Sequence, residues 1–152
     1  MAAVLGTSPL CREAGYWRAM SQQNVEVVRR IERAFNKGDI DALVAELHPA
    51  VEWEEQPIPG IDPIYHGHEG VRRWAEAIMG QELGTLQAHV EGFTDAGDAV
   101  IASTRISGAG QSSGVEVQMH VQLVVTFREG KVARRQVFQR REEALEAVGL
   151  RE

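Results

Sequence analysis

The sequence predicts an α+β fold in which helices come first and a sheet follows. Apolar residues recur at helical spacing in the first half of the chain, but they alternate with polar residues over residues 115–127. Seven apolar side chains in this alternating segment define one buried face of a long strand. The expected architecture is a curved antiparallel sheet covered on one face by three N-terminal helices, with a short C-terminal helix.

The first two helices are predicted from their apolar spacing and their end signals. The first begins after Met20, and Gly38 ends it. Its apolar stripe consists of Val27, Val28, Ile31, Ala34 and Phe35. Asp39 can cap a second helix, because its side-chain oxygen can accept from the free N–H groups of the first turn. This second helix includes Leu47, and Pro49 ends it.

The third helix and the sheet follow a short strand around Val51–Trp53. The helix begins near His68, buries Val71, Trp74, Ala75 and Ile78, and ends at Gly80. Residues 85–139 then read as four strands. The turns between these strands are predicted at 95–98, 108–114 and 128–131, and a terminal helix at 141–148.

Composition limits the classes of function. A chain of 152 residues with 43% apolar content suits one domain, here residues 21–150, after a disordered or mis-annotated extension over 1–20. The net charge of −6 argues against nucleic-acid binding, which needs clustered Lys and Arg. Cys11 is the single cysteine, so no intrachain disulfide can form, and no apolar run is long enough to span a membrane. We expect a cytoplasmic protein.

Several segments carry a resemblance to a known family. They are Asn24–Arg30, Phe35–Asp41, Val51–Trp53, Tyr65–Val71, Asp95–Asp98, Arg128–Val132 and Arg141–Leu145. Through them, residues 21–150 resemble the SnoaL-like and ketosteroid-isomerase-like branch of the nuclear transport factor 2 superfamily. The resemblance implies a dimer with a conical cavity between sheet and helices, and no cofactor. It also implies a function among isomerases, polyketide cyclases, hydrolases and ligand-binding proteins.

Glu55 is the candidate catalytic base. Alternation along the first strand puts Val51, Trp53 and Glu55 on one face, and the apolar pair marks that face as the inner one. The position is similar to that of the catalytic aspartate in ketosteroid isomerases, and an apolar surrounding suits a carboxylate that moves protons. The competing interpretation is that Glu52, Glu54 and Glu55 form an acidic run on a solvated surface.

Two arginines are candidates for stabilising negative charge. The register of the resemblance points Ser103, Arg105 and Ser107 inward from one strand. It also points Arg135, Val137 and Gln139 inward from the last strand. A buried guanidinium needs an acid or an anionic ligand beside it. Arg105 is therefore predicted to be catalytic. The alternative for Arg105 is a place at the sheet edge, and the alternative for Arg135 is that it belongs to an exposed basic run.

Other members of the superfamily use groups that this chain lacks. The oxyanion donors of ketosteroid isomerases match Ile31 and Leu123 here, so steroid isomerisation in its familiar form is not expected. Epoxide hydrolysis is a further alternative, but Ser107 and Gln139 stand where that chemistry would place an acid. His66 and His68 have no third ligand at a fixed spacing, so no metal is predicted.

The remaining site residues are predicted to line the cavity and contact the ligand. The predicted ligand-binding set is Trp53, Tyr65, Trp74, His89, Ser103, Leu123, Val125, Arg135 and Gln139. His120 is expected on the outer sheet face, where related proteins dimerise. The predicted function is cofactor-free proton transfer, isomerisation or cyclisation on a small cyclic carbonyl or polyketide-like compound. The alternatives are a ligand-binding or stress-associated protein without catalysis and a protein-interaction module.

Overall fold

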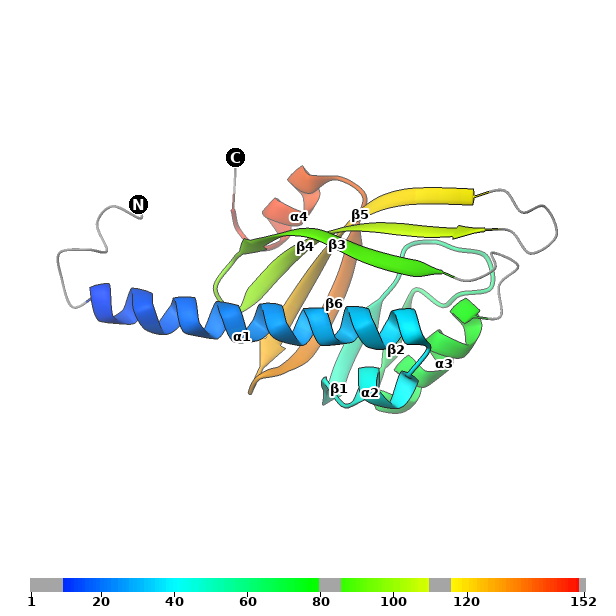
Figure 1. Ribbon diagram of the computed structural model, residues 1–152, viewed down its shortest axis with the longest axis horizontal. Coiled ribbons are helices and arrows are strands. Elements are labelled where there is room, and N and C mark those ends of the chain that lie inside the picture. Colours follow the sequence, from blue (N-terminus) through cyan, green and yellow to red (C-terminus); the bar gives the residue numbers. More distant parts are fainter. Residues whose placement is uncertain (1–9, 80–85, 110–115, 151–152) are drawn as a thin grey trace.

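The computed structural model describes residues 10–79, 86–109 and 116–150, which form a curved, unclosed six-stranded sheet and four helices (Figure 1). The helices are α1 Leu10–Lys37, α2 Ile40–Val44, α3 Gly67–Met79 and α4 Arg141–Ala147. The strands are β1 Leu47–Glu54, β2 Ile64–His66, β3 Gln87–Asp95, β4 Ala99–Ala109, β5 Glu116–Arg128 and β6 Lys131–Phe138. The predicted α+β class and its long meander of strands are confirmed.

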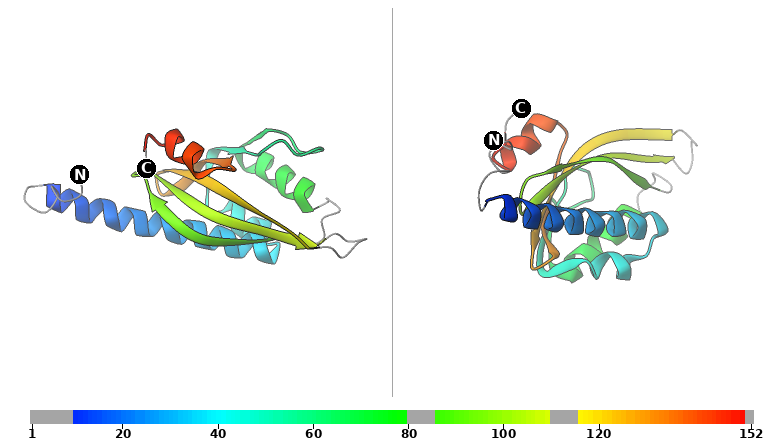
Figure 2. Two further views of the ribbon diagram at one scale, coloured as in Figure 1. Left: turned by 90° about the horizontal axis from the view of Figure 1, so that it is seen from above. Right: turned by 60° about the vertical axis from the view of Figure 1, so that its left-hand side comes forward.

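The sheet order is β2-β1-β6-β5-β4-β3. The predicted antiparallel meander is confirmed in the pairs β3–β4, β4–β5 and β5–β6. The short strand β2 pairs antiparallel with β1, whereas β1 and β6 run parallel. Figure 2 shows α1 lying across the hollow of this curved sheet and α4 on its other side. The last residues of β1 and the middle of β6 are therefore neighbours inside the hollow.

Two hairpin turns lie where the sequence predicts them. Between β3 and β4, Gly97 has a φ of 82° and its N–H donates to Asp95 Oδ1 at 3.0 Å. Between β5 and β6, Glu129 and Gly130 both have positive φ, as a tight turn between twisted strands requires. The third predicted turn, at 108–114, falls largely outside the described residues.

The predicted boundaries of the helices differ from the observed ones at three places. α1 begins at Leu10 and not after Met20, because Ala, Arg and Glu favour helix even where no apolar stripe is present. The domain boundary at residue 21 stays a prediction. α2 is capped by Asp39, whose Oδ1 accepts from Ala42 N at 3.1 Å, but the helix ends at Val44. The predicted end of α3 at Gly80 lies outside the described residues.

Leu47 and Pro49 belong to β1 and not to the second helix. Leu47 is fully buried and pairs with Val132 of β6, so strand pairing outweighs its helical spacing after Val44. Pro49 has no N–H to donate, and it falls where the register between β1 and β6 shifts. The short strand β2 pairs with the end of β1 and has no counterpart among the predicted elements.

Side chains of α1 complete the backbone hydrogen bonds of the edge strand β3. Asn36 accepts from Ala88 N at 2.7 Å and donates to Ala88 O at 2.9 Å. Glu32 Oε2 accepts from Val90 N at 2.7 Å, and Arg29 donates to Val90 O at 3.1 Å. α1 thus takes the place of a further strand beside β3, and these hydrogen bonds hold the helix over the hollow of the sheet.

The two faces of the sheet carry separate cores. The inner core joins α1, α2 and α3 to the sheet through residues such as Val28, Leu43, Trp74 and Val125. On the outer face, α4 packs Ala144 and Leu145 against Ile101 and Val124. Among the described residues no helix has the length and apolar character that crossing a membrane requires.

Candidate functional site

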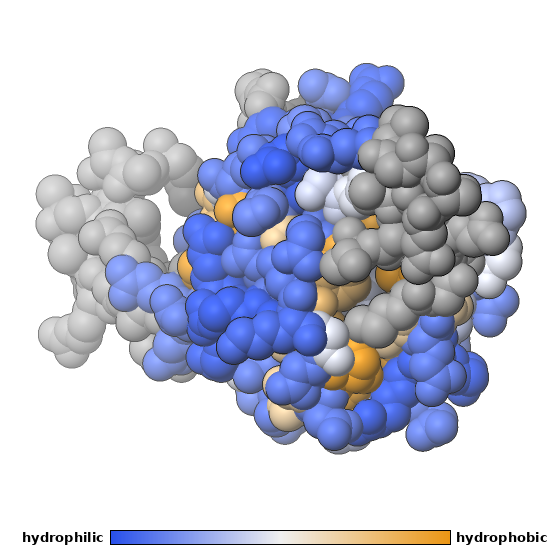
Figure 3. Space-filling model, turned by 45° about the vertical axis from the view of Figure 1, so that its right-hand side comes forward, coloured by the Kyte–Doolittle hydropathy of each residue, from blue (hydrophilic) through white to orange (hydrophobic). Residues whose placement is uncertain are grey.

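A cavity of about 140 Å³ lies between the helices and the inner face of the sheet. Figure 3 shows the apolar residues of this hollow framed by a hydrophilic surface. The apolar part of its wall includes Val28, Ile31, Phe35, Leu43, Ile58, Ile78, Leu86, Ala88, Val90, Ile106, Met119, Val121, Leu123, Val125 and Val137. Such a wall excludes water and favours an apolar ligand.

A charged pair stands in this apolar surrounding, at the end of β1 and the middle of β6. Glu55 and Arg135 are 6% and 11% exposed, and Arg135 NH1 lies 3.4 Å from Glu55 Oε1. Arg135 NH1 also donates to the backbone oxygen of Glu54 at 2.7 Å, which holds the guanidinium in place. On β1, Trp53 lies two residues before Glu55 and is the register partner of Arg135 on β6. The parallel pairing of these strands therefore brings Glu55 and Arg135 together.

Two indole rings enclose the guanidinium of Arg135. Its central carbon lies 4.6 Å from the ring centre of Trp53 and 5.2 Å from that of Trp74. The rings themselves meet edge to face, with centres 5.1 Å apart. Burial lowers the pKa of Arg135, and the negative charge of Glu55 opposes this effect. The stacking and the neighbouring carboxylate keep a cation in a place that water does not reach.

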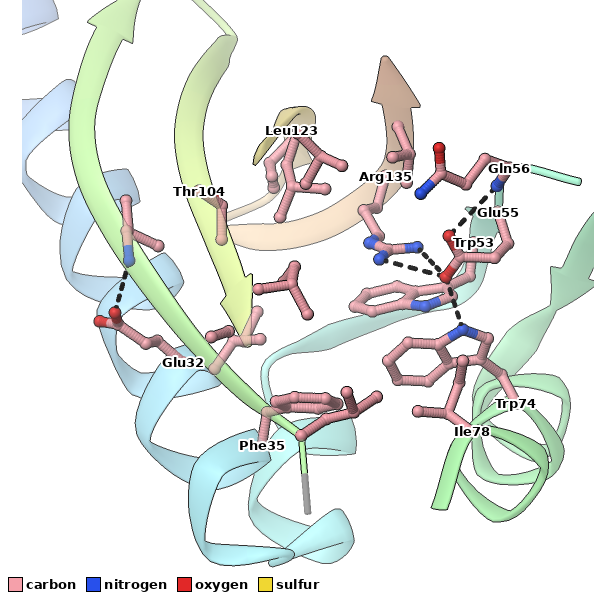
Figure 4. Close-up of a pocket in the computed structure, with 18 of the residues that line it drawn as sticks. Glu32, Phe35, Trp53, Glu55, Gln56, Trp74, Ile78, Thr104, Leu123 and Arg135 are labelled. Carbon is pink, nitrogen blue, oxygen red and sulfur yellow. Dashed lines mark hydrogen bonds and ion pairs between the residues drawn. The ribbon is translucent and has the colours of Figure 1, made fainter. Parts of the chain in front are cut away.

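The carboxylate of Glu55 is oriented by three different groups. Trp74 Nε1 donates to Oε1 at 2.9 Å, beside the bonds from Arg135 (Figure 4). The backbone N–H of Gln56 donates to Oε2 at 3.1 Å. A carboxylate oxygen can accept more than one hydrogen bond, so Oε2 retains capacity for a donor on a ligand.

Gln56 links the edges of the cavity near this carboxylate. Its side chain donates to Met119 Sδ at 3.4 Å and accepts from Gln139 Nε2 at 3.1 Å. Met119 lines the cavity and is 38% exposed, so this contact lies at the boundary between cavity and solvent. Gln56 therefore connects β1, β5 and the end of β6 at the opening.

The opposite wall also contains polar residues, but their polar atoms are engaged elsewhere. Glu32 accepts from Val90 N and lies 3.3 Å from Arg29 NH1. Thr104 donates its hydroxyl to the backbone oxygen of Ala102 at 3.0 Å. Figure 4 shows Glu32, Phe35 and Thr104 across the cavity from Glu55 and Arg135. Among the described residues, the donors that can address a ligand in the cavity are therefore concentrated on the side of Arg135.

Six of the residues predicted for the site line this cavity. They are Trp53, Glu55, Trp74, Leu123, Val125 and Arg135. The alternation along β1 places Glu55 correctly, and the period of β5 places Leu123 and Val125. Arg135 is buried, so its alternative placement in an exposed run is wrong. Ile31 and Leu123, where ketosteroid isomerases carry donors, also line the cavity and offer none.

The predicted inward placement of Ser103 and Arg105 is wrong by one residue. Leu123 faces the cavity and pairs with Ala102, so the even-numbered residues Thr104 and Ile106 of β4 face inward. Ser103 hydrogen-bonds Gln122 at 2.7 Å on the outer face. Arg105 pairs there with Glu91 at 3.3 Å, and it cannot reach a ligand in the cavity. Its assigned catalytic role has no geometric basis.

Three further predicted ligand contacts lie outside the cavity wall. His89 pairs with Arg105 across the strands and is exposed. Tyr65 is a core residue, 4% exposed, and its hydroxyl accepts from Asp62 N at 2.9 Å. Gln139 follows the end of β6 and reaches only Gln56 at the opening. For His89 the pattern identified the strand but not the face, for Gln139 it extended β6 past its end, and Tyr65 lies on a strand that was not predicted.

Sequence reasoning missed Gln56, Ile58 and Glu32 as cavity residues. Gln56 and Ile58 belong to the irregular loop 55–63, which contains three prolines and in which alternation carries no information. Glu32 follows Ile31 on the first helix, and its hydrogen bond to Val90 N of β3 depends on a tertiary contact that the helical spacing does not indicate. His68 Nε2 lies 2.8 Å from Leu47 O, and no cluster able to hold a metal ion exists in the described ranges.

Comparison with known proteins identifies the class. The model of the SnoaL-like domain matches residues 27–135, which is most of the chain. This chain therefore belongs to the SnoaL-like domain family, as its sequence motifs indicated. No match was found among curated protein sequences.

Solved structures place the fold within the NTF2-like group. TerC, co-crystallised with polyporic acid, is 22% identical with a TM-score of 0.69, over 83% of this chain and 98% of TerC. An NTF2-like protein from Burkholderia pseudomallei is 17% identical with a TM-score of 0.68, over 84% and 98% of the two chains. A putative polyketide cyclase from Xanthomonas campestris is 18% identical with a TM-score of 0.63, over 84% and 98%. At these identities the likeness establishes the fold alone.

Proposed function

We propose that this SnoaL-like protein catalyses cofactor-free proton transfer on a small cyclic carbonyl compound, leading to isomerisation or cyclisation. The observation that carries this proposal is the Glu55–Arg135 pair in an otherwise apolar cavity. A proton acceptor and a fixed positive charge stand beside each other, as the formation of an enolate requires. Arg135 takes the role for which Arg105 was the expected residue.

In the proposed step, Glu55 Oε2 accepts a proton from the carbon next to the carbonyl group. The electron pair of the broken C–H bond moves into a carbon–carbon double bond, and the carbonyl oxygen becomes negative. N–H groups of Arg135 that have no partner among the described residues donate to this oxygen. Glu55 then returns the proton to another carbon. Alternatively, the enolate carbon attacks a second carbonyl group and closes a ring, and the alkoxide formed from that carbonyl takes the proton from Glu55.

Trp74 has a positioning role in this mechanism. Its Nε1 holds Oε1 of Glu55 at 2.9 Å, and the N–H of Gln56 holds the second oxygen from the other side. A carboxylate fixed in this way loses little orientational freedom when it reacts. The two tryptophans would also stack against a planar ring, which fits a cyclic compound.

The ligand class draws support from the family. TerC is similar in fold and was crystallised with polyporic acid, and another similar structure is a putative polyketide cyclase. The apolar wall of the present cavity suits small organic molecules.

A second candidate function is ligand binding without turnover. It is favoured by the hydrogen bonds from Arg135, Trp74 Nε1 and the N–H of Gln56, which already engage both oxygens of Glu55. In that case the Glu55–Arg135 pair would only orient the ligand. The two candidates differ in whether the hydrogens next to the carbonyl group exchange with solvent.

A thermal-shift screen tests whether the cavity binds such ligands. Wild type, Glu55→Gln and Glu52→Gln are each compared with their own ligand-free melting temperature in the presence of cyclic ketones, phenols, epoxides and small carboxylates. Glu52 lies on the same strand with its side chain on the other face, so Glu52→Gln is the matched control. We expect a rise in melting temperature that is lost in Glu55→Gln and kept in Glu52→Gln. A rise that survives in Glu55→Gln contradicts the proposed role of Glu55.

We further propose a cytoplasmic homodimer that associates through the outer sheet face. The face beyond α4 carries the polar residues Gln118, His120 and Gln122, all on β5. His120 lies 3.7 Å from Glu91, with a side chain 63% exposed. Native mass spectrometry tests this: a dimer is expected, and a monomer that keeps these residues exposed would favour an interaction module.

A further inference from the structure

The volume of the cavity limits the size of the ligand that the proposed function can use. The cavity measures about 140 Å³. An apolar protein cavity of about 150 Å³ is known to hold benzene. One six-membered ring therefore fills the space, and a second fused ring requires displacement of packed side chains such as Val125, which is 5% exposed.

The polarity of the wall limits where the ligand can carry its oxygens. On one side, Glu55 Oε2 can accept a further hydrogen bond and Arg135 can donate one. On the other side, Glu32 is engaged by Val90 N and Arg29, and Thr104 donates to Ala102 O. Among the described residues, no side chain on that second side offers a free donor, so a ligand oxygen pointed there lacks a donor partner. A hydroxyl group there could reach only acceptors that already carry a hydrogen bond or have donated their own.

We infer that the cavity selects a neutral single-ring compound whose polar groups, one hydrogen-bond donor and one acceptor, are adjacent on one edge of the ring. The donor faces Glu55 and the acceptor faces Arg135, while the hydrocarbon edge faces Phe35 and the helix α1. A neutral ligand is selected because Glu55 already balances the charge of Arg135. This inference rests on the proposed function and names its substrate class.

The test uses two isomers that differ only in the placement of their hydroxyl groups. Catechol carries them on adjacent carbons and resembles a ring enol, whereas hydroquinone carries them at opposite ends. Binding of each to the full chain is measured by isothermal titration calorimetry at neutral pH without oxygen. We expect hydroquinone to bind about tenfold more weakly or worse, since its second hydroxyl group finds no donor on the far wall and only acceptors that are already engaged. The catechol analogue with a second fused ring should also bind about tenfold more weakly.

Variants check that the selectivity comes from the polar edge. In Arg135→Met the preference for catechol over hydroquinone should fall to less than about threefold, because the acceptor loses its partner. Arg134→Met, a change at the neighbouring position on the outer face, should keep the wild-type preference. If Arg135→Met does not fold, Glu55→Gln is measured instead, and it should weaken catechol binding more than hydroquinone binding.

Equal binding of the two isomers, tighter binding of hydroquinone or binding of neither would overturn the inference. So would equal binding of the two-ring analogue. The proposed function is judged separately by the Glu55-dependent thermal shift with cyclic ketones. If a cyclic ketone gives a Glu55-dependent thermal shift but catechol and hydroquinone bind equally, the proposed proton transfer is retained and only the inferred ligand class is rejected.

Discussion

The buried pair of Glu55 and Arg135 makes a quantitative prediction about stability. Arg135→Met leaves the carboxylate of Glu55 without its cation at a site only 6% exposed. Removing one partner of a buried ion pair costs about 3–5 kcal/mol. Glu55→Gln leaves the guanidinium of Arg135 without its anion, but the amide oxygen can still accept from Trp74 Nε1 and from Arg135, so we expect a cost at the low end of this range, about 3 kcal/mol.

The double variant Glu55→Gln/Arg135→Met separates the pair from its surroundings. It leaves no unpaired charge in the cavity, so its loss of stability should be smaller than the sum of the single losses by about 2 kcal/mol or more. Urea unfolding followed by circular dichroism measures each variant. With a slope of about 2 kcal/mol per molar urea, a loss of 4 kcal/mol lowers the midpoint by about 2 M.

The adjacent surface pair provides the matched control. Arg134 NH2 lies 2.7 Å from Glu54 Oε2, closer than the buried pair, but the side chains are 46% and 28% exposed. The cycle of Glu54→Gln and Arg134→Met should therefore give a coupling of about 1 kcal/mol or less. Additive losses at the buried pair, within about 0.5 kcal/mol, would refute the reasoning that the two charges stabilise each other in a low-dielectric site.

Other changes give further expected outcomes. Trp74→Phe removes the donor to Glu55 and should lower the unfolding free energy by about 1.5–3 kcal/mol in urea titrations, and an unchanged midpoint would contradict that bond. Glu32→Ala leaves the N–H of Val90 without its acceptor, so hydrogen–deuterium exchange at that amide should accelerate, while exchange at the β5 amides should not. Asp39→Ala removes the cap of α2 and should lower the free energy of unfolding, measured by heat or urea, by about 1 kcal/mol. Asp39→Asn keeps an oxygen that can accept from Ala42 N, so its free energy of unfolding should stay close to that of the wild type.

The sheet could be predicted because its strands carry strong period-two signals. The alternation in β5 identifies the buried face that includes Leu123 and Val125, and both line the cavity. The turn at Gly97 is readable because Asp and Gly side by side favour a tight reversal. The alternation and the turn residues are local features of the sequence, so they can be recognised without knowing which strands are neighbours in the sheet.

The site was harder to predict because it depends on register between strands. β4 carries alternating small and polar residues such as Ser103 and Arg105, so its own sequence does not say which parity faces inward. Only its pairing with β5, where Ala102 lies opposite Leu123, decides that question. A register error of one residue moved Arg105 from the outer face into the predicted site.

Arg135 and Glu55 come together because β1 and β6, the first and last strands along the chain, are neighbours in the sheet. The parallel pairing of β1 with β6 places Trp53 opposite Arg135, although they are far apart in the chain. No local sequence pattern predicts this pairing, because most of the domain lies between β1 and β6 along the chain. The sequence indicated each residue as a candidate, but their hydrogen-bonded contact required the structure.

The most direct test of the proton-transfer role is hydrogen exchange on a bound cyclic ketone. A ketone that raises the melting temperature is incubated in heavy water with wild type, Glu55→Gln or Glu52→Gln, and loss of the hydrogens next to the carbonyl group is followed by NMR. We predict that wild type and Glu52→Gln accelerate the exchange over buffer, and that Glu55→Gln reduces this acceleration by about a hundredfold or more. Exchange of equal rate in wild type and Glu55→Gln would contradict the assignment of Glu55 as the base.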